Sequence, residues 1–396
     1  MKIYGLESLF EFVLILGCFE SDAITPTIRV CSDDRPQVER LLCRRISQQL
    51  KTITSAKGSR IDDLFISGLT VVIEEECQNV ADRCSICDIL LSSQGLSSGP
   101  KLTYCDNLAC GFSFTELGVC FNVIEEIQRN GTAVELLLSF AYAALSSSGS
   151  HRERLFTSCP TDFLASNGTA DFSKLSSGLS LIPPIQSLRK VSSDGEIRKT
   201  LGPENFRLLR YIIATNRSFI LSVPSTSKYY LSGLGGDQFL ISSADPKREV
   251  KFQQACQQYG YTWAYHGSRS CNWWNIIGLN QGVKNLSGTT LQRNGAAHGP
   301  GVYLSITPGT ACSYGGGFSP RPGISNISSG SAVVVCQIVK APEYNSWVKS
   351  NSYLVIPNDF YVLPRYFVIN CNSSGNVGNI NTTNFCSSEV LSELFT

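Results

Sequence analysis

The chain has few charged residues and almost no net charge. Asp, Glu, Lys and Arg make up 16% of its 396 residues, and the formal net charge at pH 7 is +1. Proteins that bind nucleic acid usually carry a clustered basic field, because contacts with phosphates dominate that affinity. The composition therefore argues against direct binding of nucleic acid.

Several common sequence signals are also missing. The chain has no internal repeat and no G-x-G-x-x-G motif between a strand and a helix, so a Rossmann-type dinucleotide site is not expected. Beyond the N-terminus, no stretch approaches the roughly 20 continuous apolar residues of a membrane-spanning helix. The only membrane question therefore concerns the first residues.

The apolar run Ser8–Phe19 has two interpretations. It resembles the core of a secretory signal peptide, with the small residues of Ser21–Ala23 as a cleavage neighbourhood. Glu7 and Glu11 count against a signal peptide. In the second interpretation, residues 1–24 form an N-terminal helix or strand. We expect a cytoplasmic location slightly in preference to the secretory pathway.

The length and the 42% content of hydrophobic residues predict two or three folded domains with sizeable cores. Helices are expected over Pro36–Lys51, Val119–Arg129, Ala133–Ser146 and Pro203–Ala214, and a strand at Leu69–Ile73. A linker rich in Ser, Gly and Pro is expected over 151–200. The remaining ranges become an N-terminal domain (25–150) and a C-terminal domain (201–396). Short β-like runs dominate the latter: Thr262–His266, Gly301–Ser305, Ala332–Val339, Tyr353–Ile356 and Arg365–Ile369.

Four of the sixteen cysteines stand apart by their spacing. Cys84 and Cys87 form one short pair, and Cys105 and Cys110 form a second pair soon after. Two such pairs can bring four thiolates to the corners of a tetrahedron, which suits a structural zinc ion. The alternative is a pair of disulfides or four unlinked thiols, which a secreted chain would favour.

The C-terminal half contains the most specific motifs. His266-Gly267-Ser268 is followed by Asn272-Trp273, and later by the run Gly-Ala-Ala-His-Gly-Pro-Gly-Val-Tyr303-Leu-Ser. Together with the cysteine pairs, these motifs resemble the poly(ADP-ribose) polymerase (PARP) superfamily. In particular, they resemble the sixth and eighth PARP family members, which are mono-ADP-ribosyltransferases. The resemblance covers about residues 65–390.

The resemblance implies an α+β protein. A mostly antiparallel β catalytic domain of the ADP-ribosyltransferase type follows a smaller α/β domain rich in cysteine. It also implies NAD as cosubstrate and protein side chains as acceptors. His266 and Ser268 would contact the adenine ribose, and the backbone of Gly267 would bind the nicotinamide carboxamide. Tyr303 and Tyr314 would stack on the two faces of the nicotinamide ring. Without the flanking motif, an ordinary core position is the simpler interpretation of either tyrosine.

Two positions depart from the pattern of polymerising relatives. Tyr353 stands where they carry a catalytic glutamate, and a phenol with a reference pKa near 10 is a poor base at neutral pH. Chain elongation should therefore fail while single transfer survives. Ala311 stands where relatives carry a serine that bonds the carboxamide, so either Thr310 or Ser313 replaces that serine or one hydrogen bond is absent.

Two function classes remain open from sequence. One is an enzyme that transfers a single ADP-ribose from NAD to a protein, with His266, Tyr303 and Tyr353 as its catalytic residues. The other is a catalytically inactive relative kept as a binding or scaffold protein, which Tyr353 and Ala311 favour. Residues 285–301 are expected to form the loop over the NAD site. His298 and His151 are expected at the surface, without a role.

Overall fold

The computed structural model describes most of the C-terminal two thirds of the chain and parts of the N-terminal third. The described residues are 12–17, 25–30, 45, 71, 75–76, 79, 82–91, 104–105, 107–115, 123–147, 156, 159–242, 246–279, 282–285, 297–323, 326–350, 352–378 and 394. The chain divides into two compact units, Met1–Phe121 and Asn122–Thr396. This division falls before the boundaries at 150 and 200 that composition suggested.

The first unit contains a hairpin and a short helix. Strand β1 (Phe12–Gly17) pairs antiparallel with β2 (Thr25–Val30), and α3 covers Leu108–Thr115. The expected helix at Pro36–Lys51 lies outside the described residues except for Arg45, which is helical. The expected strand at Leu69–Ile73 is represented only by Val71, which is helical, so the strand prediction is wrong at that residue.

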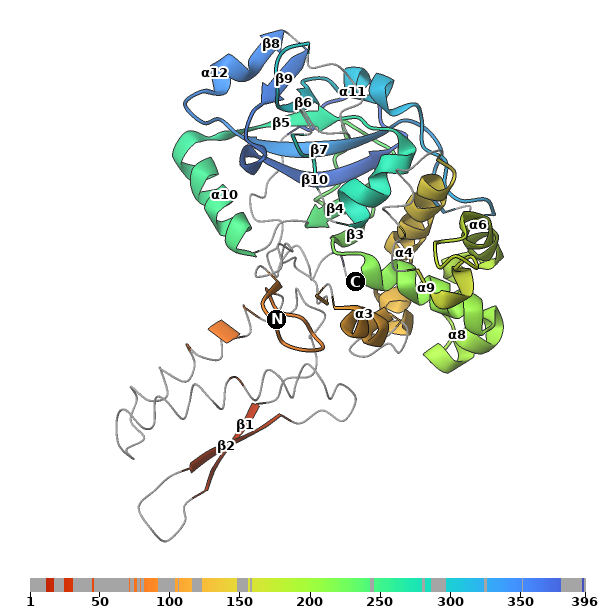
Figure 1. The fold of residues 1–396 in the computed structure, drawn as a ribbon. Coiled ribbons are helices and arrows are strands. Elements are labelled where there is room, and N and C mark those ends of the chain that lie inside the picture. Colours follow the sequence, from red (N-terminus) through yellow and green to blue (C-terminus); the bar gives the residue numbers. More distant parts are fainter. Residues whose placement is uncertain are drawn as a thin grey trace. The chain divides into compact units, whose positions relative to one another are not determined.

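The second unit is built on one eight-stranded sheet (Figure 1). Its strand order is β3-β4-β10-β7-β5-β6-β9-β8, and every neighbouring pair is antiparallel. All eight residues of β7 and all eight of β10 are buried, which makes these strands the centre of the core. The strands are β3 (Phe219–Val223), β4 (Asp237–Ser242), β5 (Tyr261–His266), β6 (Val302–Ser305), β7 (Ala332–Val339), β8 (Val348–Ser350), β9 (Tyr353–Ile356) and β10 (Val362–Ile369).

The α+β fold with an antiparallel sheet agrees with the sequence prediction, and all five strands predicted for the C-terminal domain are present. Three helices were missed in a domain expected to have few: α10 (Pro246–Tyr259), α11 (Pro308–Gly315) and α12 (Tyr344–Trp347). In α10, Phe252 and Cys256 are buried among mostly polar residues, so the apolar periodicity is too sparse to indicate a helix.

The two helices expected on either side of residue 130 form a single helix, α4 (Val123–Leu145), with a kink at Asn130. The backbone there leaves the helical region (φ −153°, ψ 68°). The Asn130 side chain accepts a hydrogen bond from the Ala133 N–H at 3.1 Å, as an N-cap does, and restarts the helix. The expected apolar stripe is buried: Val134, Leu137, Leu138, Ala141 and Leu145.

The range 151–200, expected as a linker, contains helices that its composition did not indicate. It contains α6 (Phe172–Leu181), α7 (Ile185–Leu188) and most of α8 (Asp194–Leu201), and α9 (Pro203–Thr215) follows. The polar residues that suggested a loop instead cap helices. Asp171 accepts the N–H groups of Ser173 and Lys174, and Ser193 accepts that of Glu196. Within the described part of the chain, no helix has the length and apolar character needed to cross a bilayer.

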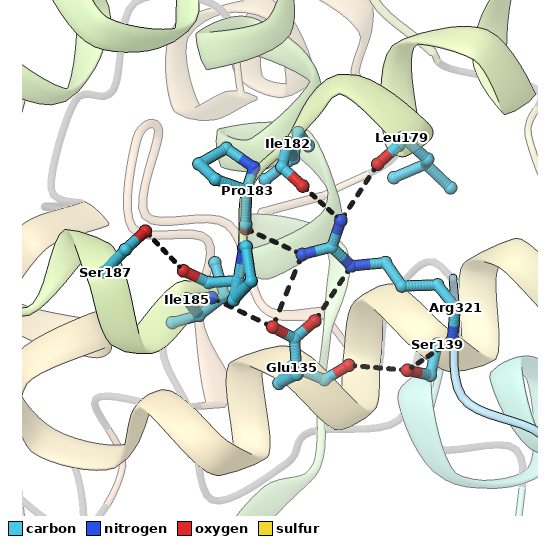
Figure 2. Close-up of polar contacts among 9 residues, drawn as sticks. Glu135, Ser139, Leu179, Ile182, Pro183, Ile185, Ser187 and Arg321 are labelled. Atoms are coloured by element: carbon cyan, nitrogen blue, oxygen red, sulfur yellow. Dashed lines mark hydrogen bonds and ion pairs between the residues drawn. The ribbon is translucent and has the colours of Figure 1, made fainter. Parts of the chain in front are cut away.

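A buried ion pair ties these helices to the segment that follows α11 (Figure 2). The Arg321 guanidinium donates to the Glu135 carboxylate at 2.8 and 3.3 Å, and the two side chains are 1% and 0% exposed. Arg321 also donates to the carbonyls of Leu179, Ile182 and Pro183. Glu135 accepts the N–H of Ile185 at 2.9 Å. One charge pair therefore fixes α4, the end of α6 and the start of α7.

Candidate active site

The site begins where β5 ends, at His266. The imidazole Nδ1 lies 3.1 Å from the main-chain oxygen of Tyr303 on the neighbouring β6. A carbonyl can only accept, so Nδ1 carries the proton and Nε2 is left with a lone pair. Desolvation lowers the pKa of His266, and the bond to the Tyr303 carbonyl opposes this only in part. The ring is therefore neutral at pH 7, and Nε2 can accept a hydroxyl hydrogen bond.

The next two residues are held by α11 and by a short turn. A Cβ placed on Gly267 would stand 1.7 Å from the carbonyl oxygen of Ala311. Only glycine therefore fits where these two main-chain segments come so close. The Ser268 hydroxyl accepts a hydrogen bond from the Asn272 amide at 2.8 Å. Its own proton remains available for a ligand.

Tyr303 closes the glycine-rich turn that enters β6. Its hydroxyl donates to the Gly299 carbonyl at 2.8 Å and accepts the main-chain N–H of His298 at 3.0 Å. Gly299 has φ +93°, a conformation that suits glycine. Most of the expected loop at 285–301 lies outside the described residues, but its last residues are anchored by this tyrosine.

The register of β6 with β9 brings Tyr353 to the same face as Tyr303. Tyr303 pairs with Val355 and Ser305 pairs with Tyr353, and residues two apart on a strand share a face. The hydroxyl of Tyr314, on α11, donates to that of Tyr353 at 3.4 Å. This hydrogen bond is the main cause that raises the pKa of Tyr314, and burial adds to it. Tyr314 therefore stays a neutral phenol at neutral pH, although 51% of it is exposed.

The fold thus brings together the six residues proposed from sequence. They come from the end of β5 and the two residues after it, from β6, from β9 and from α11: His266, Gly267, Ser268, Tyr303, Tyr353 and Tyr314. The histidine that sequence left without a role also belongs to the group. The His298 side chain is exposed, as expected, but its ring centroid lies 6.2 Å from that of Tyr353 with the planes tilted by 34°. Its place inside the Gly-Ala-Ala-His-Gly-Pro-Gly-Val-Tyr run was the available signal.

The two hydroxyls that could replace the serine missing at Ala311 differ in their hydrogen bonds. Ala311 is buried, with its carbonyl against Gly267. The hydroxyl of Thr310 accepts from that of Thr307 at 2.9 Å, and the Ser313 hydroxyl donates to the Thr310 carbonyl at 2.7 Å. The Ser313 hydroxyl therefore uses its proton within the helix, whereas the Thr310 hydroxyl only accepts there.

The four spaced cysteines gather in the first unit. The sulfur atoms of Cys84, Cys87, Cys105 and Cys110 all lie within 4.8 Å of one another, and those of Cys87 and Cys105 are 3.7 Å apart. Tetrahedral zinc with Zn–S bonds of about 2.3 Å places its sulfurs about 3.8 Å apart, whereas a disulfide requires about 2.05 Å. All ten cysteines among the described residues are free thiols. The cluster has the geometry to hold a metal ion.

The turn after the first cysteine pair suits such a site. Asp88 adopts a left-handed conformation (φ +67°), and its N–H bonds the Cys84 carbonyl at 2.9 Å. Arg45 donates to both Glu76 and Asp88 and so fixes the turn. Burial, and then the neighbouring sulfurs, raise the pKa of Cys110, a cost that a bound dication offsets.

Curated proteins match most of the chain, whereas no protein-family model matches it. Two of these proteins are named protein mono-ADP-ribosyltransferase PARP8, one from Mus musculus and one from Homo sapiens. Each is 27% identical over 350 residues, which cover 78% of this chain. This homology supports a catalytic domain of the PARP superfamily. The chain spans about two fifths of the length of these relatives, since the match covers 39% of each.

Proposed function

We propose that the chain is a protein mono-ADP-ribosyltransferase, an NAD-dependent glycosyltransferase that moves one ADP-ribose from NAD to a protein side chain and releases nicotinamide. The observation that carries the proposal is the contact of His266 with Tyr303, at the point where β5 and β6 meet the tyrosines of β9 and α11. The similarity to proteins named as mono-ADP-ribosyltransferases supports it.

In this proposal the chain's own residues bind and orient NAD. The Nε2 lone pair of His266 accepts a hydroxyl of the adenine ribose, and Ser268 supports the same sugar. The main chain of Gly267 bonds the nicotinamide carboxamide, while the rings of Tyr303 and Tyr314 hold the nicotinamide from its two sides. Without a serine at position 311, the carboxamide lacks one hydrogen bond, which weakens binding by about 1 kcal/mol.

Cleavage of the bond between nicotinamide and ribose passes through an oxocarbenium-like state, as in glycoside chemistry. That state needs orientation of NAD more than a strong base. Among the described residues, none of the contacts of Tyr303, Tyr314 and Tyr353 is to a carboxylate. The group therefore suits one transfer better than repeated elongation of a chain, which requires activation of a ribose hydroxyl.

We further propose that Cys84, Cys87, Cys105 and Cys110 hold a structural zinc ion in the first unit. The support is the 3.7 Å sulfur separation and the clustering of all four thiols. With four thiolate ligands the site is closed, so zinc would stabilise the unit and would take no part in the transfer.

A catalytically inactive scaffold is the alternative, favoured by Tyr353 in place of an acid and by Ala311 in place of a serine. Incubating the purified chain with labelled NAD and weighing the product by mass spectrometry separates the two functions. We expect one ADP-ribose adduct and stoichiometric nicotinamide, both lost in His266→Ala. A chain that folds but gives neither product is the scaffold.

A further inference from the structure

His298 occupies an unusual position beside the candidate site. Its main-chain N–H is bonded to the Tyr303 hydroxyl, which fixes where the residue stands. Its imidazole lies against the ring of Tyr353, with 6.2 Å between ring centroids, and the side chain is exposed. The residue therefore combines closeness to the reacting region with access from outside.

The other groups of the site are poorly suited to remove a proton. Tyr314 donates its hydroxyl to Tyr353, and this bond raises the pKa of Tyr314. The Nδ1 of His266 is committed to the Tyr303 carbonyl, and desolvation lowers the pKa of that ring. An acceptor with a protonated nucleophile needs a base near its path of approach. Imidazole is the side chain that best accepts a proton near neutral pH.

We propose that His298 is the general base that takes the proton from the incoming protein nucleophile, and that the site therefore serves acceptors with a hydroxyl or a thiol. The inference rests on the proposed transferase function. It deepens that function because a carboxylate acceptor is already ionised at neutral pH and needs no base.

The proposed step is balanced within the site. The bond between the ribose C1′ and the nicotinamide nitrogen breaks, and nicotinamide leaves as a neutral molecule with the bonding pair. The oxygen or sulfur lone pair of the acceptor forms the new bond to C1′. Its proton passes to a ring nitrogen of His298, and the imidazolium then releases it to solvent.

The groups that face His298 do not supply another charge. Tyr353 faces the ring from β9, and Tyr303 meets its main chain from β6. Tyr314 of α11 donates its hydroxyl hydrogen bond to Tyr353. All three are phenols, so among the described residues no acid competes with the imidazole as base and no ion pair holds it charged.

Variants can separate the chemical role of the His298 imidazole from the structural role of the His298 main chain. Any residue other than proline keeps the main-chain N–H that bonds Tyr303. His298→Gln therefore removes the base and keeps that anchor. His298→Phe also keeps an aromatic ring against Tyr353, which makes it the matched control for packing.

The experiment uses the full chain with labelled NAD and follows adduct formation on the chain itself from pH 5 to pH 8, where imidazole side chains titrate. We expect the wild-type rate to fall in acid. In both His298→Gln and His298→Phe the rate at pH 8 should be about 100-fold lower and its pH dependence lost. The KM for NAD should not change. The adducts should resist neutral hydroxylamine, which cleaves carboxylate esters.

A wild-type rate and pH profile in His298→Phe would show that only the ring matters and would overturn the inference while leaving the transferase function intact. Adducts confined to hydroxylamine-labile carboxylates would also overturn the inference and leave the transferase function intact. A wild-type chain that forms no adduct at any pH overturns both proposals.

Discussion

Glu135 and Arg321 form a buried bidentate ion pair although 186 residues separate them in the chain. Arg321 satisfies three further carbonyl groups at the ends of α6 and α7, and Glu135 accepts an N–H at the start of α7. The pair thus orders helices that the sequence alone presents as a polar linker. Its charges are compensated only as long as both partners are present.

Replacing Arg321 by Met should therefore destabilise the second unit by about 3–5 kcal/mol, because Glu135 is left as an uncompensated buried charge. The double variant Glu135→Leu/Arg321→Met should lose clearly less than the sum of the two single changes. Urea denaturation of the three variants measures this. Additive losses would mean that the two side chains act independently.

Gly267→Ala should abolish NAD binding, because the new methyl carbon collides with the Ala311 carbonyl and pushes α11 away from β5. Gly195→Ala is the matched control. It lies in α8, where the nearest atom to a new Cβ is 3.7 Å away. That change should leave NAD binding intact and add up to about 1 kcal/mol of stability. Calorimetric titration with NAD measures the affinity of each variant. Equal affinities in the two variants would contradict the role of the close contact between Gly267 and Ala311.

The lowered pKa of His266 predicts a stability that depends on pH. Below the ordinary histidine pKa of about 6.5, the unfolded chain binds a proton at this residue that the folded chain resists. Stability should therefore fall from pH 7 to pH 5, by at most about 1.4 kcal/mol per pH unit from this one group. Thermal or urea unfolding of His266→Gln should show a shallower decline. The same decline in both proteins would assign the effect to other groups.

One zinc ion per chain should copurify with the protein. Cys105→Ser removes one of the four clustered sulfurs and should lower the metal content and destabilise the first unit. Cys271→Ser, a half-buried cysteine outside the cluster, should leave the zinc content unchanged. Elemental analysis of the purified variants tests this without reference to activity. Full zinc retention in Cys105→Ser, or none in the wild type, would argue against the site.

Removing the Tyr303 hydroxyl should disturb the turn before β6 more than the sheet. Tyr303→Phe leaves the Gly299 carbonyl and the His298 N–H without their shared partner, which should cost about 1–3 kcal/mol if both stay shielded from water. The ring that we propose to face nicotinamide is kept, so we expect a higher KM for NAD rather than complete loss of turnover. Steady-state kinetics distinguish the two, and an unchanged KM would show that the turn is held by other contacts.

The sequence by itself determined the five strands predicted for the C-terminal domain and singled out the residues proposed for the site. The apolar runs at Ala332–Val339 and Tyr353–Ile356 became β7 and β9 with the expected bounds, because buried strands carry a strong local signal. The motifs around His266 and Tyr303 also carried enough local information to select residues that lie in contact.

Only the tertiary structure decided the rest. The helices at 172–201 depend on caps and on the Glu135–Arg321 pair, and no local pattern shows a partner so distant in sequence. The place of His298 beside Tyr353 likewise follows from the pairing of β6 with β9. Strand pairing and buried charge compensation join residues far apart in the chain, so only the folded molecule reveals them.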